Sequence, residues 1–500
     1  MKKIKNNVFL MWMAGLLIGV SCTTPTDIQV ERETVDLAFP VFTSETSISE
    51  LIDGGVDSTA LVVHSDHEMG LYYETKTHVG VSMPELEDMS LDLNPMTTIP
   101  NLPVSGVNIE KAKFDGGTMS FSFRNTQFDK NIKVVLRVNQ LSKDGGIFSK
   151  TLDLDYTGSF PVTADVAVPL EGYKMDISQS PLQIEYQASF NDGSTASIDE
   201  AKMEMKEAEF GWVEGDWGVQ SIPVETPDHE IGFFDHYSNG GVVHFANPKL
   251  NIIAQNSVGI PSKFVFNGIT VNTLGSGEIS VFGDFVDDGF SLAYPSIDQL
   301  GTYLTSVDEM NKTNSNIVEI FNAQPTDINY DIDFLVSPGG NGTGFIAKDA
   351  GVDLTMGVEL PFEGTLSDFK VEKSFDVKFT NEYVQAATMK LYAKNQIPLD
   401  ARIQMYFLDN AGIVLDSLVA SNGILAVSSA IVAPSGDVIQ AKKWDEEVSI
   451  DLDKWSRIKS AVEVKLVTSF TSSSAGQVPV KIKSNQRVEL NAGLKLVVQP

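Results

Sequence analysis

The chain has 500 residues, one cysteine, and 36 basic against 67 acidic side chains, which gives a formal net charge of −31. This acidity argues against a nucleic-acid-binding surface, because such surfaces need clustered lysine and arginine to neutralise phosphates. One cysteine excludes an intramolecular disulfide or a cysteine-rich zinc module, whereas 42% hydrophobic residues suffice to form the cores of roughly two to four domains.

The N-terminus has the pattern of a bacterial export signal. Three lysines within residues 1–5 precede an apolar run, Val8–Val20, which is shorter than the roughly 20 residues that span a bilayer. The run ends at Ser21 and Cys22, where a signal peptidase would cut. We therefore predict a signal peptide over residues 1–21 and lipid attachment at Cys22, with more than one acyl chain giving stable anchoring.

The residues before Cys22 resemble a lipobox, with Gly19 where leucine is usual and Ser21 beside the cysteine. Two alternatives stay open. Ordinary secretion is one, because Gly19 and Ser21 also satisfy the small-x-small rule for cleavage, and an uncleaved anchor is the other. Residues 22–33 are polar and predict a short lipidated tether. We expect a cell-envelope location, as an outer-membrane lipoprotein that faces either the periplasm or the cell surface.

Strand patterns dominate the mature sequence. Apolar and polar residues alternate in segments such as Thr118–Asn125, Ile132–Val138, Arg402–Leu408 and Val462–Phe470, and turn signals rich in Gly, Asn and Asp separate them. This pattern predicts an all-β fold of tandem β-sandwich modules of the immunoglobulin-like type rather than a parallel α/β sheet.

One helical insertion is predicted near residues 296–322. The segment Ser296–Met310 has apolar residues at the spacing of one helix face: Ile297, Leu300, Leu304 and Val307. This face would cover an open sheet edge, or act as a lid over a lipid or a partner. Asn316–Asn322 would continue as a second short helix. Another short helix is predicted at Ser47–Asp53, which begins with capping-box spacing.

A weak internal repeat predicts three β modules. Each copy consists of a strand, a corner and a second strand, with an asparagine at the corner: Asn125, Asn256 and Asn395. Asparagine favours such corners because its side chain can hydrogen-bond the neighbouring backbone. After the tether, the predicted parts are an N-terminal β-rich segment (residues 34–100), β module 1 (101–225), β module 2 with the helical insertion (226–365) and β module 3 (366–500).

The run Asn247–Pro261, NPKLNIIAQNSVGIP, resembles sequences in uncharacterised β-rich lipoproteins of the Bacteroidota type. More loosely, it resembles the immunoglobulin-like module of late-embryogenesis-abundant group-2 proteins. The resemblance covers these residues and the region around Phe39-Pro40 and Ser47–Asp53. It implies an exported β-sandwich protein. It implies no enzyme, and no catalytic or ligand residue can be transferred from it.

Two histidine clusters have the composition of a metal site. The first is the run from His64 to Glu68, and the second is looser: Asp228, His229, Asp235, His236 and His244. Because zinc needs three convergent ligands with supporting partners, we interpret the first as a polar hairpin tip and the second as a solvated loop or interdomain contact. Asp284–Asp288 lacks the spacing of a calcium-binding EF-hand. We therefore predict no metal and no cofactor.

Acid pairs raise the question of glycoside hydrolysis, which uses two carboxylates. Asp153 and Asp155, like Asp331 and Asp333, alternate with apolar neighbours, and ordinary strand patterning accounts for that spacing. The sequence contains no Gly-x-Ser-x-Gly elbow, P-loop or dinucleotide motif. We therefore predict that the protein is not an enzyme and keep a carbohydrate-active hydrolase as a third hypothesis.

Tryptophans flank two acidic runs in pairs, Trp212 with Trp217 and Trp444 with Trp455. Each pair could contact a glycan by stacking, or one ring could pack in a core while the other shields a domain junction. The leading hypothesis is a non-catalytic, lipid-anchored envelope protein that binds or assembles through protein–protein contacts. Its expected partners are the membrane, through the N-terminal lipid, and other envelope proteins, but no nucleic acid. Glycan or lipid binding is the second hypothesis.

Overall fold

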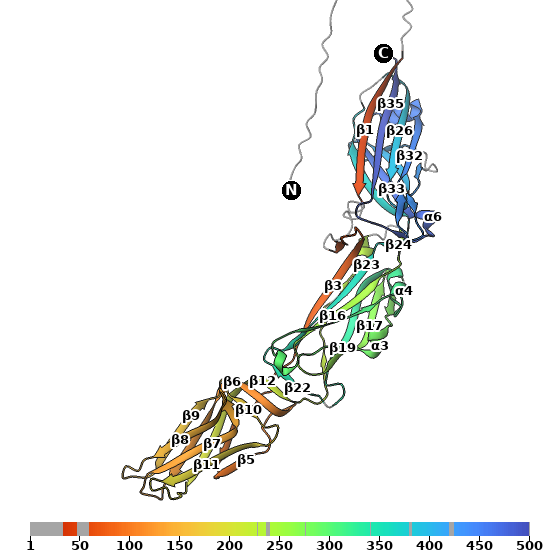
Figure 1. The fold of residues 1–500 in the computed structure, drawn as a ribbon. Coiled ribbons are helices and arrows are strands. Elements are labelled where there is room, and N and C mark those ends of the chain that lie inside the picture. The colour runs from red at the N-terminus through yellow and green to blue at the C-terminus, as the bar shows by residue number, and fades with distance from the viewer. Residues whose placement is uncertain are drawn as a thin grey trace, which may run out of the picture.

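The computed structural model describes residues 34–47, 60–227, 229–236, 241–275, 277–340, 342–379, 383–419 and 425–499. Antiparallel sheets form three sandwich modules in a curved row (Figure 1). We name them the terminal module (residues 34–47 and 369–499), the middle module (60–81 and 217–361) and the tip module (82–216). The predicted all-β class is confirmed.

Strands make up most of each module, and short helices occur in the middle and terminal modules. The tip module contains β4 (Met89–Asp92), β5 (Met96–Ile99), β6 (Asn108–Asn125), β7 (Ile132–Lys143), β8 (Gly146–Leu154), β9 (Val162–Pro169), β10 (Lys174–Asp176), β11 (Leu182–Phe190) and β12 (Glu200–Asp216). The middle module contains β2 (Leu61–Val63), β3 (Met69–Gly80), β13 (Gln220–Pro223), β14 (His229–Glu230), α2 (Phe233–His236), β16 (Lys249–Asn256), β17 (Ser262–Thr273), β18 (Gly277–Ser280), α3 (Asp284–Asp288), β19 (Phe290–Leu292), the 3₁₀ helix η1 (Ile297–Gln299), β20 (Leu304–Met310), α4 (Ile317–Asn322), β21 (Pro325–Val336) and β23 (Gly351–Pro361).

The terminal module contains β1 (Val35–Ser47), β25 (Phe369–Asp376), β26 (Val384–Asn395), β27 (Leu399–Leu408), β28 (Val414–Ser417), β29 (Leu425–Val427), β30 (Ile431–Val432), β31 (Val438–Gln440), β32 (Lys442–Ile450), α5 (Leu452–Ile458), β33 (Glu463–Ser472), α6 (Ser473–Gly476) and β35 (Arg487–Val498). Four short strands lie at the junctions between modules: β15 (Val242–Phe245), β22 (Thr343–Ala347), β24 (Glu363–Ser367) and β34 (Val480–Lys481).

The three modules share one strand arrangement. The first sheet has the order β9-β6-β12-β4 in the tip module, β20-β16-β23-β3 in the middle module and β32-β26-β35-β1 in the terminal module. The facing sheet has the orders β8-β7-β11-β5, β18-β17-β21-β13 and β28-β27-β33-β25. All these pairings are antiparallel, so the chain contains three copies of the same sandwich.

The modules are nested rather than consecutive. In the tip module, β4 is followed directly by β5 after the turn at Leu93–Pro95. In the middle module, the whole tip module is inserted between the corresponding strands, β3 and β13. In the terminal module, both other modules are inserted between β1 and β25. Each insertion therefore occurs at the same place, between the strand by which the chain leaves the first sheet and the first strand of the facing sheet.

Two expectations from the sequence differ from this structure. Residues 34–100 are not a unit of their own, because β1 pairs with β35, β3 with β23 and β4 with β12. The helix expected at Ser296–Met310 is wrong: η1 is followed by the edge strand β20, which pairs with β16. Pairing with a neighbouring strand outweighs local apolar spacing here. The expected second helix is confirmed as α4, and the helix expected at Ser47–Asp53 lies outside the described residues except for Ser47, which ends β1.

The buried side chains form two apolar clusters. One cluster continues from the tip module into the middle module, and the other fills the terminal module. Aromatic rings connect the facing sheets, as where Phe42 of β1 stacks on Phe375 of β25 with ring centroids 4.4 Å apart. The core therefore joins strands that lie far apart in the sequence.

A buried asparagine forms the same corner in each module. Asn125, Asn256 and Asn395 are the last residues of β6, β16 and β26, and none is more than 1% exposed. The side-chain oxygen of each accepts a hydrogen bond from the N–H group two residues later, which belongs to Gln127 (3.1 Å), Val258 (2.9 Å) or Ile397 (2.9 Å). The side-chain amide donates to the carbonyl of Phe128 (2.7 Å), Ala293 (2.9 Å) or Leu399 (2.8 Å). The corner predicted at each repeat is confirmed.

We predict that Asn395→Ala lowers the free energy of unfolding of the terminal module by about 2–4 kcal/mol, because buried hydrogen bonds to Ile397, Leu399 and Ser428 are lost. Urea denaturation of the purified protein measures the change. Asn410→Ala, in an exposed turn, is the matched control and is expected to change stability by less than about 0.5 kcal/mol. Equal, small effects of the two substitutions would contradict the role of the buried corner.

Candidate functional site between the middle and terminal modules

The middle and terminal modules meet at a three-stranded sheet in which β24 pairs with both β15 and β34. β15 precedes the sandwich strand β16, β24 connects β23 to β25, and β34 precedes β35. The loop after β34 adds two backbone hydrogen bonds across the junction. Ser484 N–H donates to the carbonyl of His67, and Ile482 N–H donates to that of Phe362, both at 2.9 Å. Short strands and backbone bonds therefore hold the two sandwiches together.

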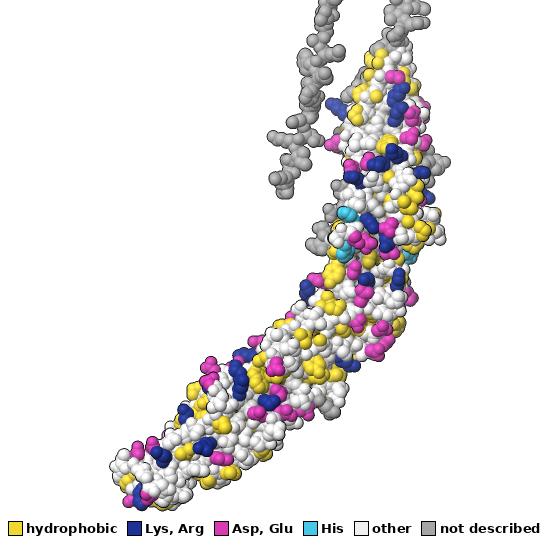
Figure 2. Space-filling view, viewed as in Figure 1, with side chains coloured by type: hydrophobic (Ala, Val, Ile, Leu, Met, Phe, Trp, Pro, Cys, Tyr) yellow, Lys and Arg dark blue, Asp and Glu magenta, His cyan; other side chains and the backbone are white. Residues whose placement is uncertain are grey.

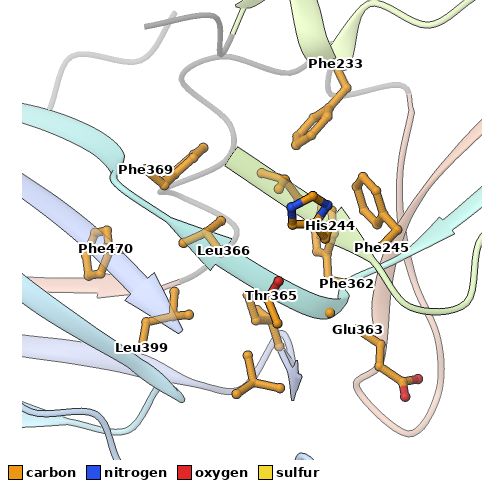
Figure 3. Close-up of a pocket in the computed structure, with 14 residues that line it drawn as sticks. Phe233, His244, Phe245, Phe362, Glu363, Thr365, Leu366, Phe369, Leu399 and Phe470 are labelled. Carbon is orange, nitrogen blue, oxygen red and sulfur yellow. The ribbon is translucent and has the colours of Figure 1, made fainter. Parts of the chain in front are cut away.

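An apolar pocket of about 70 Å³ lies at this junction (Figure 3). Phe233 and Phe245 line it from the middle module, Leu399 and Phe470 line it from the terminal module, and Leu366 of β24 lies between them. No sequence pattern singles out these side chains, because they come from separate segments that only the tertiary structure brings together. Their clustering defines the candidate site.

The chemistry of the pocket suits a small apolar group. Its lining in the described residues includes one carboxylate and one imidazole, from Glu363 and His244. The Glu363 carboxylate lies 3.9 Å from the ammonium of Lys481, which is also 3.8 Å from Glu68. The volume is about half that of a 150 Å³ cavity that holds benzene. The pocket can therefore accept a short hydrocarbon group rather than a drug-sized ligand.

The second histidine cluster is divided between two places. His229, on β14, is buried, and its Nδ1 lies 2.8 Å from the hydroxyl oxygen of Tyr330 on β21. Burial lowers the pKa of His229 and raises the pKa of Tyr330. His244 instead pairs with Thr365 of β24 and lines the junction pocket. The other expected members of this cluster are outside the described side chains: Asp228, Asp235 and His236.

The first histidine cluster forms the turn between β2 and β3, as expected for a hairpin tip. His64 N–H donates to the carbonyl of Glu68 at 2.9 Å, and Glu68 N–H donates to the carboxylate of Asp66 at 3.2 Å. His67 Nδ1 lies 3.3 Å from the hydroxyl of Ser484, so this tip packs against the terminal module. Within the described residues, no group of three or more His, Cys, Asp or Glu side chains could hold a metal ion.

The acid pairs lie on exposed or half-buried strand faces. Asp331 and Asp333 alternate along β21, and the side-chain amide of Asn267 donates to both carboxylates at 3.2 Å. Asp153 of β8 is opposite Lys133 of β7, and Asp155 directly follows β8. Asp284–Asp288 forms the short helix α3, with Phe285 buried beneath it. Strand pairing and helix packing thus account for these positions, as the alternating pattern predicts.

The tryptophans of each pair have different environments. Trp217 and Trp455 are buried, at 5% and 4% exposure, which agrees with the alternative that one ring of each pair packs in a core. Trp217 lies between the tip and middle modules, where its Nε1 donates to the carbonyl of Gly344 at 3.1 Å. Trp212 and Trp444 are half-buried on β12 and β32, and glycan contact through them stays a prediction.

Cys22 and the apolar run Val8–Val20 lie outside the described residues, so lipid attachment stays a prediction. In the part of the chain that the structure describes, no helix combines the length and the hydropathy required to cross a membrane.

The fold defines the chain as an all-β protein built from three nested sandwiches. No protein-family model and no curated protein matches it. A solved structure described as a "putative secreted protein" of Parabacteroides distasonis is similar over 57% of this chain and 89% of its own, with 15% identity and a TM-score of 0.35. A particle structure of infectious bursal disease virus aligns over 91% and 83%, with 8% identity and a TM-score of 0.14. Similarities this low carry no inference about function.

We predict that the stability of the middle module depends on pH through His229. Burial lowers the pKa of His229 in the folded protein, so the unfolded chain takes up a proton first as the pH falls below about 6.5. The free energy of unfolding therefore decreases from pH 7.5 to 5, with His229 contributing up to about 1.4 kcal/mol per pH unit.

Urea denaturation at these two pH values measures the effect, and His229→Gln is expected to show the smaller pH dependence. His64→Gln, at the exposed hairpin tip, is the matched control. A pH dependence that is the same in wild type and His229→Gln would rule out this contribution.

Proposed function

We propose that the chain is a non-catalytic, lipid-anchored protein of the bacterial cell envelope that acts as a binding or assembly component through protein–protein contacts. The observation that carries this proposal is where the ends of the described chain lie. Val35 pairs with Val498 at one end of the row, and the tip module forms the opposite end (Figure 1). A lipid on Cys22 would hold the terminal module near the membrane and leave the tip module farthest from it.

The junctions support a role as a stiff spacer. Because the modules are nested, the chain crosses each junction twice. Between the tip and middle modules, β22 pairs with Trp212–Asp216 at the end of β12, so a strand of the middle module extends the sheet of the tip module. Two covalent crossings and a shared sheet restrict rotation more than one flexible linker would.

The far end of the tip module supports protein contact. The loops at residues 126–131, 155–161 and 191–199 follow the ends of β6, β8 and β11 that point away from the junction. They and the adjoining strand ends carry two aromatic pairs, Phe128 with Phe190 at 5.3 Å and Tyr156 with Phe160 at 5.0 Å between ring centroids. Phe160 is 42% exposed, and aromatic side chains are enriched where proteins bind each other.

Replacing the lipidated cysteine tests the anchor. We predict that full-length Cys22→Ala, expressed in a bacterium that processes lipoproteins, moves from the membrane fraction to the soluble envelope fraction. Thr23→Ala leaves the cysteine in place and is expected to stay with membranes. Sedimentation and immunoblotting measure the distribution. Membrane association of Cys22→Ala equal to that of wild type would show that lipid does not hold the protein.

Replacing an exposed ring at the tip tests the binding surface. We predict that Phe160→Ser abolishes recovery of the envelope partner in a pull-down of the membrane-anchored protein, because it removes the most exposed ring of the tip loops. Phe282→Ser changes an exposed phenylalanine of the middle module, at 61% exposure, and is the matched control. Quantitative mass spectrometry compares the two. If Phe282→Ser loses the partner and Phe160→Ser keeps it, the binding surface is on the middle module and not at the tip.

The junction pocket favours a second candidate function, capture of an apolar ligand. Five phenylalanines line it: Phe233, Phe245, Phe362, Phe369 and Phe470. The helical lid expected over a lipid at Ser296–Met310 is a strand edge instead, so the pocket is the better candidate for apolar binding, with room for one short hydrocarbon group. Organic extraction of the purified protein tests this function, because a captured apolar compound would copurify. The ligand-binding hypothesis also includes glycan binding through Trp212 and Trp444, and a glycan array tests it.

A further inference from the structure

One end of the terminal module collects the strand ends farthest from the middle module. In the first sheet, β1 begins, β35 ends and β26 begins there, because Val498 pairs with both Val35 and Val384. In the facing sheet, β27 ends and β33 begins there, because Leu408 pairs with Glu463. Helix α5 crosses between β32 and β33 at the same end.

Exposed apolar side chains gather at this end. We call the following six residues the apolar end: Val35, Tyr383, Ile413, Val414, Leu452 and Val462. Their exposure ranges from 45% for Val35 to 64% for Tyr383. Hydrogen bonds place three of them beside the strand ends: Gln499 N–H donates to Tyr383, Asp409 N–H donates to Ile413, and Val462 N–H donates to Leu408. Figure 2 shows hydrophobic side chains among charged ones in this region.

At Ile413, the local fold does not require an apolar residue. At the turn between β27 and β28, the carboxylate of Asp409 accepts hydrogen bonds from the N–H groups of Ala411 and Ile413, both at 2.9 Å. Gly412 has a positive φ of 76°, which glycine adopts readily. The side chain of Ile413 adds nothing to this turn and is 62% exposed. A polar residue would serve the turn equally well, so the apolar residue points to a contact outside the chain.

The tether brings this end close to the proposed anchor. Residues 22–33 separate Cys22 from the described chain, and a stretch of that length spans at most about 40 Å when extended. If Cys22 carries lipid, β1 begins within that distance of the bilayer, and the apolar end is the part of the folded protein nearest to it.

The charges at this end indicate which lipid surface it fits. Arg457 is paired with Asp416 at 2.6 Å and Lys495 with Asp36 at 2.8 Å. The other cations at this end are Lys378, Lys454 and Lys459, and the acidic side chains of Asp376, Asp409, Asp451, Asp453 and Glu463 lie among them, so acidic groups outnumber basic ones. A polybasic attraction to anionic lipid is therefore not the basis of contact. Exposed aliphatic side chains and a tyrosine are instead typical of residues that enter the interface of a bilayer.

We propose that the apolar end of the terminal module rests on a zwitterionic phospholipid bilayer, with Tyr383, Ile413 and Val414 in the headgroup region. This proposal rests on the lipid anchor at Cys22 and adds a second contact, made by the folded protein. Two contacts would fix the orientation of the three modules relative to the bilayer, whereas a tether alone would allow every orientation.

A single fluorescent label tests the contact. The only natural cysteine is Cys22, whose thiol the lipid consumes, so Ile413→Cys supplies a unique thiol in the lipidated full-length protein. The protein is reconstituted into vesicles of phosphatidylcholine and phosphatidylethanolamine and labelled with an environment-sensitive fluorophore. Lipids with spin-labelled acyl chains then quench the fluorophore if it lies in the interface.

Ile439→Cys is the matched control. Ile439 is 67% exposed and lies at the opposite end of the same module, near the junction, where Lys481 N–H donates to the carbonyl of Gly436. We expect quenching at position 413 to exceed that at 439 at least threefold, and Tyr383→Ser to reduce the quenching at 413.

The outcomes separate this proposal from the anchor. Lipidated protein that floats with the vesicles but is quenched equally at positions 413 and 439 would overturn the second contact and leave the anchor standing. Protein that does not float with the vesicles at all would overturn both. Stronger quenching at position 439 than at position 413 would mean that the opposite end of the terminal module faces the bilayer, which also overturns the proposal.

Discussion

Antiparallel pairing of β1 with β35 is the constraint on which the architecture depends. The two strands stay in register from Val35 opposite Val498 to Ser47 opposite Arg487, with one bulge near Pro40. Because the first and last described strands lie side by side, the chain that leaves the terminal module after β1 must return to it at β25. Closing so long a loop is thermodynamically tolerable, since each doubling of loop length costs only about 0.6 kcal/mol. The double crossing at each junction follows from this closure.

Nesting also implies an order of folding. The tip module is continuous over residues 82–216, so the strand orders β9-β6-β12-β4 and β8-β7-β11-β5 can form before the rest of the chain is in place. Once folded, it brings the end of β3 near the start of β13, which shortens the effective loop that the middle module must close. The middle module then does the same for β1 and β25. Local contacts form before distant ones in this order, as chain entropy favours.

The sequence allowed some of this architecture to be predicted and concealed the rest for physical reasons. Asn125, Asn256 and Asn395 revealed three repeated corners, because an asparagine that hydrogen-bonds its neighbouring backbone is a local feature. The pairing of β1 with β35 joins distant parts of the chain: Glu45 and Arg487, which form an ion pair across the two strands, are 442 residues apart. No local sequence pattern predicts such a pairing. β20 was mistaken for a helix because Leu304 and Val307 fit helical spacing, while its pairing with β16 is invisible in the segment itself.

The candidate site was harder to predict than the fold. Its lining residues belong to α2, β15, β24, β25, β27, β33 and β34 and to the segments beside them, and each of its apolar residues, taken alone, has the pattern of an ordinary core residue. The tryptophans were selected from the sequence as possible ligand contacts, but large aromatic side chains are usually buried in folded proteins. Trp217 and Trp455 follow that rule.

The two junctions differ in packing, and that difference determines where the rod is softest. Between the tip and middle modules the apolar core is continuous, and the ring of Phe345 packs so closely on Gly259 that a side chain there would collide with it. Between the middle and terminal modules the cores are separate, only Leu61 and Phe362 among the described residues pack against both, and the junction contains a pocket of about 70 Å³. Side chains that line a void lose dispersion contacts on that side, so bending costs least there. Within a rod whose doubly crossed junctions both restrict rotation, we therefore expect any bending to occur first beside the terminal module, with the tip and middle modules keeping their arrangement.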